Sequence, residues 1–331
     1  MNRLTLSLAL TPNHFSRPLI DGSVAVQGVE FIPTTLNASE LYWRQLRFGD
    51  FDVSEMSLSS LYIAHARGNR QWTALPVFNM RRFFHTLIMV RKAAGIRVPA
   101  DLRGKRVGVP EYQQTSAVWS RGVLQHEFDV RPGEIEWFME RGADRSHGAA
   151  TGFAPPPGVR VHQIAPESSI GEMLLGGSLD ATLLYLRSDN LVDRSKADLG
   201  AQEAVSSLFA DPLAEGCRYH ARTGLYPINH TVVVRTSLLE QHPWLALNLY
   251  TGFVAAREAI HAIRRSALAP WIDTGSLGVD VVRALQSDPA PYGLKYARRE
   301  LATIARYLHE QGLTGGEVAL DEVFAPSTLE L

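Results

Sequence analysis

Two apolar segments that begin with the same dipeptide place the strongest constraint on how this chain can fold. His-Thr-Leu-Ile-Met-Val occupies residues 85–90, and His-Thr-Val-Val-Val occupies residues 230–234. Short apolar runs of this kind are typical of buried strands. Each follows a polar segment, as expected where a chain crosses between two lobes. We therefore predict that the chain leaves one lobe near residue 86 and returns to it near residue 232.

The length of the chain agrees with two lobes. It has 331 residues, whereas single hydrophobic cores stop growing at about 250–300 residues. The two crossings define a discontinuous first lobe, residues 1–86 plus 232–331, and a second lobe, residues 87–231. We expect a ligand cleft between them.

Strand-like and helix-like segments alternate along the chain, which predicts an α/β fold with mixed sheets and helices on both faces. The alternating run at residues 1–10 predicts a first strand and not a signal peptide, so we expect a cytoplasmic protein. Residues 115–128 predict a helix, and residues 243–264 and 296–313 predict two long C-terminal helices. Residues 141–158 are rich in Gly, Pro, Ala and Ser, which predicts an exposed flap.

Charge and cysteine content exclude several classes of protein. Lys plus Arg number 33 and Asp plus Glu number 34, so no overall field attracts nucleic acid or an anionic membrane. No run reaches the roughly 18 apolar residues of a membrane-spanning helix. Cys217 is the single cysteine, which excludes an internal disulfide and a cysteine-based zinc site.

Six motifs occur in order along the chain and together resemble one enzyme family. They are Asp-Val-Ser-Glu-Met-Ser (52–57), Arg-Arg-Phe-Phe-His (81–85), Asp-Leu-Arg-Gly-Lys-Arg-Val-Gly-Val-Pro-Glu-Tyr-Gln (101–113), Val-Trp-Ser-Arg-Gly (118–122), Thr-Gly-Leu-Tyr-Pro-Ile-Asn-His (223–230) and Glu-Gln-Gly-Leu (310–313). On these motifs the chain resembles the 4,5-dihydroxyphthalate decarboxylase family. It departs from the family pattern at Asn229 and in the Pro/Ala-rich stretch 149–157.

The resemblance implies both a fold and a reaction. Members of the family resemble type II periplasmic-binding proteins, a two-lobed "Venus flytrap" fold, without an export signal. The implied activity is the non-oxidative decarboxylation of 4,5-dihydroxyphthalate to protocatechuate and carbon dioxide in phthalate catabolism. Two alternatives stay open: a non-catalytic cytoplasmic solute-binding protein for a small aromatic or dicarboxylic anion, and an enzyme of the same fold acting on another such acid.

Decarboxylation by ring protonation needs an acid and a base at the cleft. His230 and His85 are the candidates for proton transfer, because imidazole titrates near neutrality and both lie at the predicted crossings. Glu55 or Glu111 is expected to orient a substrate hydroxyl or an imidazole. Which member of each pair has which role stays open.

A dicarboxylate also needs anchors. Arg81 or Arg82 is expected to hold a carboxylate in bidentate fashion, and only one of them faces the cleft because neighbours on an extended segment point opposite ways. Residues 111–116 precede a helix whose free N–H groups form a second anion seat. The remaining expected substrate-binding residues are Ser57, Tyr112, Gln113, Thr115, Ser116, Arg121, Tyr219 and Thr223.

Two further expectations concern cofactors and assembly. No motif with metal-ligand spacing such as His-Glu-x-x-His occurs, so we expect no cofactor. The alternative is a divalent metal ion bound by His85 and His230. We also expect a homo-oligomer, with Leu301, Ile304 and Leu308 of the last helix forming either a dimer face or part of the core.

Overall fold

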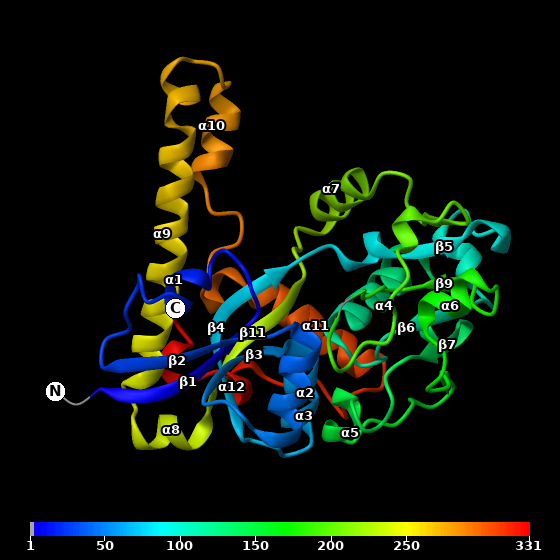
Figure 1. The fold of residues 1–331 in the computed structure, drawn as a ribbon, viewed down its shortest axis with the longest axis horizontal. Helices are drawn as coiled ribbons and strands as arrows, with labels where there is room; N and C mark the ends of the chain where they lie inside the picture. The colour runs from blue at the N-terminus through cyan, green and yellow to red at the C-terminus, as the bar shows by residue number, and fades with distance from the viewer. Residues whose placement is uncertain (1–2, 188) are drawn as a thin grey trace.

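The computed structural model describes residues 3–187 and 189–331, and its strands form two sheets (Figure 1). The first sheet has the order β2-β1-β3-β11-β4 and is built from β1 (Leu4–Leu10), β2 (Val29–Thr35), β3 (Val53–Ser57), β4 (Trp72–Arg81) and β11 (Ile228–Arg235). The second has the order β10-β5-β9-β6-β7-β8 and is built from β5 (Met89–Arg91), β6 (Arg106–Val109), β7 (Glu136–Met139), β8 (Arg160–Gln163), β9 (Ala181–Thr182) and β10 (Val205–Ser207).

Both sheets are mixed, as expected from the sequence. In the first sheet β1 runs parallel to β2 and β3, whereas β11 is antiparallel to both β3 and β4. In the second sheet β6 runs parallel to β7 and β9, whereas β5 is antiparallel to β9 and β10. The predicted α/β fold class is therefore confirmed.

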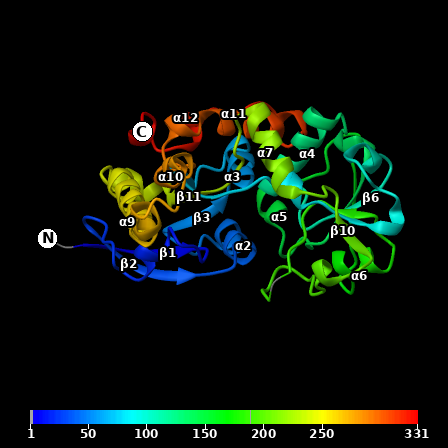
Figure 2. The same cartoon turned by 90° about the horizontal axis from the view of Figure 1, so that it is seen from above.

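Helices surround the two sheets and leave a division between them when the molecule is seen from above (Figure 2). The helices are α1 (Arg17–Ile20), α2 (Ala38–Phe48), α3 (Leu58–Ala66), α4 (Thr115–Phe128), α5 (His147–Thr151), α6 (Ile170–Leu175), α7 (Pro212–Thr223), α8 (Thr236–Gln241), α9 (Leu245–Asp273), α10 (Val279–Gln286), α11 (Arg298–Glu310) and α12 (Leu320–Val323). Capping side chains fix the N-termini of several helices. Asn37 caps α2 by accepting from the Ser39 N–H, and Ser169 caps α6 by accepting from the Glu172 N–H.

The chain crosses between the sheets at two adjacent places. It leaves the first sheet after Arg81 and re-enters it at Ile228, which pairs with Arg81, and the Arg82 N–H donates to the Pro227 carbonyl at 3.0 Å. The predicted strand at residues 85–90 is mostly wrong, because residues 84–87 form a 3₁₀ turn and only Met89–Arg91 pair as a strand. The lobe boundaries at residues 86 and 232 stay a prediction.

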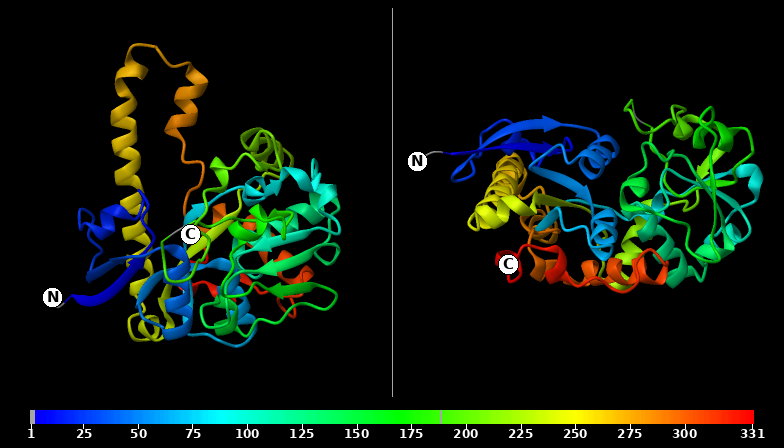
Figure 3. Two further views of the ribbon diagram at one scale, coloured as in Figure 1. Left: turned by 45° about the vertical axis from the view of Figure 1, so that its right-hand side comes forward. Right: turned by 90° about the horizontal axis from the view of Figure 1, so that it is seen from below.

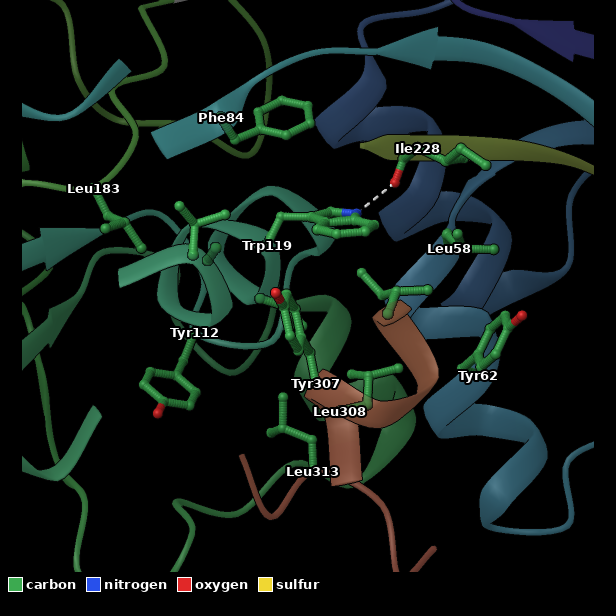
Figure 4. Packing of buried hydrophobic residues seen from close by; sticks show 14 of the residues in the cluster. Leu58, Tyr62, Phe84, Tyr112, Trp119, Leu183, Ile228, Tyr307, Leu308 and Leu313 are labelled. Atoms are coloured by element: carbon green, nitrogen blue, oxygen red, sulfur yellow. Dashed lines mark hydrogen bonds between the residues drawn. The ribbon is translucent and has the colours of Figure 1, made fainter. Parts of the chain in front are cut away.

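One hydrophobic core spans both sheets. It joins Met56 and Leu61 beside the first sheet to Val107 of the second, with Trp119 of α4 and Leu301 of α11 packed between them. The close-up in Figure 4 shows Trp119 among side chains from β11, α3 and α11. The two lobes are therefore packed against each other through their interiors.

The C-terminal helix α11 belongs to this core. Leu301, Ile304 and Leu308 have no exposed surface, because α11 packs against both α3 and α4. The suggestion that these residues form a dimer face is therefore wrong, and the alternative of core packing holds.

The segment predicted to be an exposed flap is partly buried. Residues 147–151 form α5, whose N-terminus is capped by Ser146, and His147, Gly148 and Thr151 are buried. Helix α5 packs against α2 and α3. Composition alone missed this because the contacts that fix the segment are long-range. Among the described residues, no helix is both long and apolar enough to cross a membrane.

The close contact between α4 and α11 leaves no room for a side chain at residue 122. A Cβ built on Gly122 would lie 2.1 Å from Cδ2 of the Tyr307 ring. Alanine normally favours a helix over glycine by about 1 kcal/mol, but we expect Gly122→Ala to lower the free energy of unfolding by about 1–3 kcal/mol through overpacking. Chemical denaturation measures this. Gly315→Ala is the control, since nothing lies within 4 Å of its added Cβ. Increased stability of Gly122→Ala would contradict the packing described here.

Candidate active site

A cavity of about 370 Å³ lies between elements of the two sheets. Ser57 at the end of β3 and His230 of β11 line it from the first sheet, and Thr115 and Ser116 line it from α4. Arg82, the first residue after β4, also lines it. The structure thus brings these five predicted residues to one place.

His230 is a buried, neutral imidazole. It pairs in register with Ser57 on the neighbouring strand, so both side chains lie on the same face of the sheet. The Asn229 Nδ2 donates to Nε2 at 2.7 Å, which places the ring proton on Nδ1. Among the described residues, Nδ1 has no hydrogen-bond partner. Burial, aided by the nearby charge of His147, lowers the pKa of His230 to about 3. Nδ1 is therefore the nitrogen left for a ligand.

Tyr42 of α2 lies between two histidine rings. Its ring centroid is 4.9 Å from that of His230 and 5.8 Å from that of His147, both in edge-on geometry. Its hydroxyl is buried without a partner, and burial raises the pKa of Tyr42 well above its usual value. Tyr42 is thus a neutral hydrogen-bond donor in the cavity wall.

Arg141 and Asp193 line the opposite wall and belong to a buried ion cluster. Arg141 donates to Glu111 at 3.0 Å through Nη1 and to Asp193 at 2.8 Å through Nη2, and its Nη2 also donates to the Ser39 hydroxyl at 2.6 Å. Burial raises the pKa of Glu111, but the charges of His147 and Arg141 outweigh burial and hold it below the usual value. Glu111 is therefore an ionised support for Arg141.

His147 ties this cluster to α2. The Ser39 carbonyl can only accept, so His147 donates to it through Nε2 at 3.1 Å. Its Nδ1 lies 3.5 Å from Glu111 Oε2, and the two groups form an ion pair when the ring is protonated. Burial lowers the pKa of His147. These contacts connect helix α2 beside the first sheet to residues that follow β7 in the second.

Two features suit the cavity to an anion. Helix α4 has 14 residues and no side chain caps its N-terminus, so its free N–H groups and the positive end of its dipole are available beside Thr115 and Ser116. In the described part of the chain, the guanidinium of Arg82 contacts no carboxylate, in contrast to Arg141. Arg82 is exposed at the cavity and is free to bind a carboxylate.

His85 and Arg81 do not line the cavity. The 3₁₀ turn at residues 84–87 directs His85 into the protein, where it is fully buried and its Nε2 lies 3.1 Å from Glu215 Oε1. Burial lowers its pKa to about 4. Arg81 forms a buried ion pair with Glu300 at 3.2 Å. The prediction that His85 and His230 share a site is therefore wrong, and Arg82 is the arginine that faces the cavity.

The other predicted residues do not line the cavity. Glu55 of β3 is buried, accepts from the Thr11 N–H at 2.7 Å, and has a pKa raised by burial. Arg121 stacks 3.7 Å above the Tyr112 ring and donates to Gln311. The cavity lining does not include Glu55, Tyr112 or Arg121. It also does not include Glu111, Gln113, Tyr219 or Thr223.

The expected site residues did not include several side chains from both lobes that line the cavity. Tyr42, Arg141, His147, Asp193 and Asn229 all line the cavity. One signal was available, since Arg141 follows β7 by two residues and the carboxyl ends of parallel strands commonly form ligand sites. The Gly/Pro-rich composition of residues 141–158 concealed it.

A metal site finds no support in the side chains. Among the described residues, no group of three or more His, Cys, Asp or Glu side chains is arranged to hold a metal ion. Because His85 and His230 lie in separate surroundings, they cannot be shared ligands of one ion. The two histidines named as possible metal ligands are thus placed apart, and the expectation of no cofactor stays a prediction.

The chain has the two-lobed fold of periplasmic-binding proteins. A family model described as "ABC transporter, phosphonate, periplasmic substrate-binding protein" matches residues 24–151. The aliphatic sulphonate-binding protein of Escherichia coli has a TM-score of 0.53 at 13% identity, covering 98% of both chains. The alkanesulfonate-binding protein of Xanthomonas axonopodis pv. citri has a TM-score of 0.54 at 13% identity, covering 99% of this chain and 98% of the other.

Sequence relatives specify the family. A 4,5-dihydroxyphthalate decarboxylase of Comamonas testosteroni is 32% identical over 335 residues, covering 100% of this chain and 99% of the relative. Another of Pseudomonas putida is 37% identical over 183 residues, covering 55% of this chain and 71% of the relative. The chain belongs to the 4,5-dihydroxyphthalate decarboxylase family, which confirms the resemblance seen in its motifs.

The buried ion cluster predicts a specific dependence of stability on pH. The pKa of Glu111 is lowered in the folded protein, so its contribution is present above the unfolded pKa of about 4.3 and is lost as the pH falls further. We expect Glu111→Gln to lower the free energy of unfolding by about 2 kcal/mol at pH 7, because it removes a charged hydrogen bond from Arg141. The difference from the unmodified protein should shrink below about pH 4.

Denaturation curves measured from neutral to acidic pH test this. Glu258→Gln is the control, because Glu258 is exposed and lies 3.8 Å from Arg265, and it should change stability little. A constant difference between Glu111→Gln and the unmodified protein at all pH values would show that Glu111 is not ionised.

Proposed function

We propose that this protein is a carboxy-lyase that converts 4,5-dihydroxyphthalate to protocatechuate and carbon dioxide in phthalate catabolism. The observation that carries the proposal is the cavity itself. A buried neutral imidazole with a free Nδ1 lies in one cavity with an arginine that has no carboxylate partner and an uncapped helix N-terminus. Family membership supplies the substrate, a small aromatic dicarboxylate.

The chemistry requires that the ring be protonated before the carboxylate leaves. Direct loss of carbon dioxide would place a carbanion on the aromatic ring, which is too unstable to form. Each hydroxyl of the substrate is para to one carboxylate. When a base accepts a hydroxyl proton, electrons are pushed to the para ring carbon that bears the carboxylate, and an acid protonates that carbon; the base later returns its proton to the phenolate oxygen of the product. The carbon–carboxylate bond then breaks, its electron pair restores the aromatic ring, and carbon dioxide leaves.

His230 is the proposed proton-transfer group. Its pKa is low because burial disfavours the charged ring. A bound dicarboxylate brings negative charge close to the ring, and opposite charge favours the imidazolium. The substrate thus induces the protonated state that ring protonation requires. Arg82 and the N-terminus of α4 hold the carboxylate that is retained. Glu111 acts through Arg141 and His147, which position the cavity wall.

We further propose that the protein is cytoplasmic and forms a homo-oligomer. The apolar run near the N-terminus forms β1 between β2 and β3, so it is part of the folded core, and a cytoplasmic location suits a catabolic enzyme. The expectation of a homo-oligomer belongs to the same proposal.

Ligand binding should therefore be coupled to proton uptake. With a pKa of about 3, His230 is neutral at pH 7 and carries its one ring proton on Nδ1, and a bound dicarboxylate raises its pKa toward neutrality. Calorimetric titration with phthalate, which lacks the hydroxyls, should show a binding enthalpy that depends on the ionisation enthalpy of the buffer. His230→Gln should bind phthalate without this dependence. Identical enthalpies for the unmodified protein in all buffers would refute the coupling.

Substitutions of His230 and Arg82 should distinguish an effect on turnover from an effect on substrate binding. We expect His230→Ala to lower kcat by about 100-fold to 10,000-fold, the usual contribution of a positioned proton-transfer group. Arg82→Ala should mainly raise KM, because an anchor binds substrate and transition state alike. The ultraviolet spectrum of 4,5-dihydroxyphthalate during incubation follows the reaction.

Matched controls come from exposed residues of the same type. His162 and Arg97 lie on the surface away from the cavity. His162→Ala and Arg97→Ala should therefore leave kcat and KM unchanged. Full activity in His230→Ala would end its proposed role. If the unmodified chain binds 4,5-dihydroxyphthalate but releases no carbon dioxide, it is a solute-binding protein and the proposed activity is wrong.

A further inference from the structure

The upper part of α9 and the whole of α10 project away from the rest of the molecule. The two helices rise together above the first sheet in Figures 1 and 3. Within residues 262–287, which we call the hairpin, no residue is buried. The hairpin therefore lacks a core of its own.

An apolar stripe runs up the exposed side of α9. Lower in the helix, Leu249, Phe253 and Ala256 are buried against the first sheet. The helical spacing of three and four residues continues this same face through Ile260 to Ile263 and Trp271. Ile263 is 64% exposed and Trp271 is 55% exposed. The same apolar face of α9 is thus buried against the first sheet in the lower part of the helix and exposed to solvent in the upper part.

Helix α10 presents more apolar surface. Val279, Val281 and Leu285 are 66%, 48% and 43% exposed. The helix has only eight residues, whereas isolated helices shorter than about 12–15 residues are marginal in water. Helical stability of such short elements comes mostly from packing, so α10 needs a covering surface.

A hollow of about 500 Å³ lies at the foot of the stripe. Pro18, Ile260 and Ile263 contribute apolar walls, and Arg17 and Asp21 contribute charged groups. An apolar floor with a charged rim is the usual composition of a protein interface. The hollow is separate from the cavity that contains His230.

The charges of the hairpin change sign along its length. Asp273 and Asp280 lie near its tip, whereas Arg264 and Arg265 lie near its base. The pair between Asp280 and Arg283 is exposed and 3.7 Å long, so it contributes little. Two hairpins placed antiparallel would bring the acidic tip of each to the basic base of the other.

We propose that the hairpin is a self-association surface that pairs with the hairpin of a second copy of this chain. The two copies are related by a two-fold axis perpendicular to the hairpins, so each contact occurs twice. The stripes cover each other, and Trp271 of each copy enters the hollow at the foot of the other. The apolar continuity of α9, the hollow and the charge pattern all fit this one occupant.

Light scattering across a range of protein concentrations tests the proposal with the full chain. The unmodified protein should have twice the mass of one chain, and Trp271→Glu should reduce it to the mass of one. Leu213→Glu is the control, because Leu213 is 77% exposed on a different helix, α7, and should leave the mass doubled. Circular dichroism shows whether each variant is folded. A monomeric unmodified protein overturns the proposal, as does a Trp271→Glu protein that remains dimeric.

Charge reversal distinguishes this pairing from a contact through another face. Asp273→Arg together with Asp280→Arg should weaken the dimer, because the new arginines face Arg264 and Arg265 of the second copy. Adding Arg264→Asp and Arg265→Asp should restore it. Backbone hydrogen exchange in residues 279–286 should slow as the dimer forms. If the fourfold variant does not recover, or if exchange in α10 is independent of concentration, the antiparallel pairing is wrong.

Discussion

The packing of α4 between the two sheets is the interaction on which the rest of the structure depends. Trp119 is fully buried among residues from both sides, and its indole N–H donates to the carbonyl of Ile228 at 2.8 Å where the chain re-enters the first sheet. Helix α11 closes this core by packing against α3 and α4. Since the same helix α4 directs its N-terminus into the cavity, the element that joins the lobes also places the anion-binding end of the site.

The cavity is consequently built from fixed elements on both sides. His230 and Ser57 occupy paired positions on adjacent strands, so their separation is set by the sheet. On the opposite side Arg141 and His147 reach Ser39 of α2, and Ser57 meets Thr115 of α4 at 2.8 Å. Sites held by regular elements and supporting hydrogen bonds keep their geometry better than sites on free loops. This arrangement suits proton transfer, for which small displacements are costly.

Features with local causes were predictable from the sequence, and those with long-range causes were not. The strand at residues 228–235, the helix at residues 115–128 and the Asn37 cap follow from nearby patterning, and the alternation of an extended segment explains why Arg82 faces the cavity and Arg81 does not. His85 was misplaced because a 3₁₀ turn rotates it inward. Arg141 and His147 were missed because a buried Glu111, distant in sequence, orders a segment whose composition is typical of a loop.

The position of β11 has a consequence for how the chain is made. It fills the place between β3 and β4 in the first sheet, yet the second sheet lies between β4 and β11 in the sequence. While the polypeptide emerges from the ribosome, the edges of β3 and β4 that later pair with β11 are therefore unpaired. Unpaired strand edges are sites of aggregation. The second sheet, whose strands are contiguous in the chain, can form during that interval. The first sheet is completed only when β11 arrives, and with that strand comes His230, so the site is assembled last.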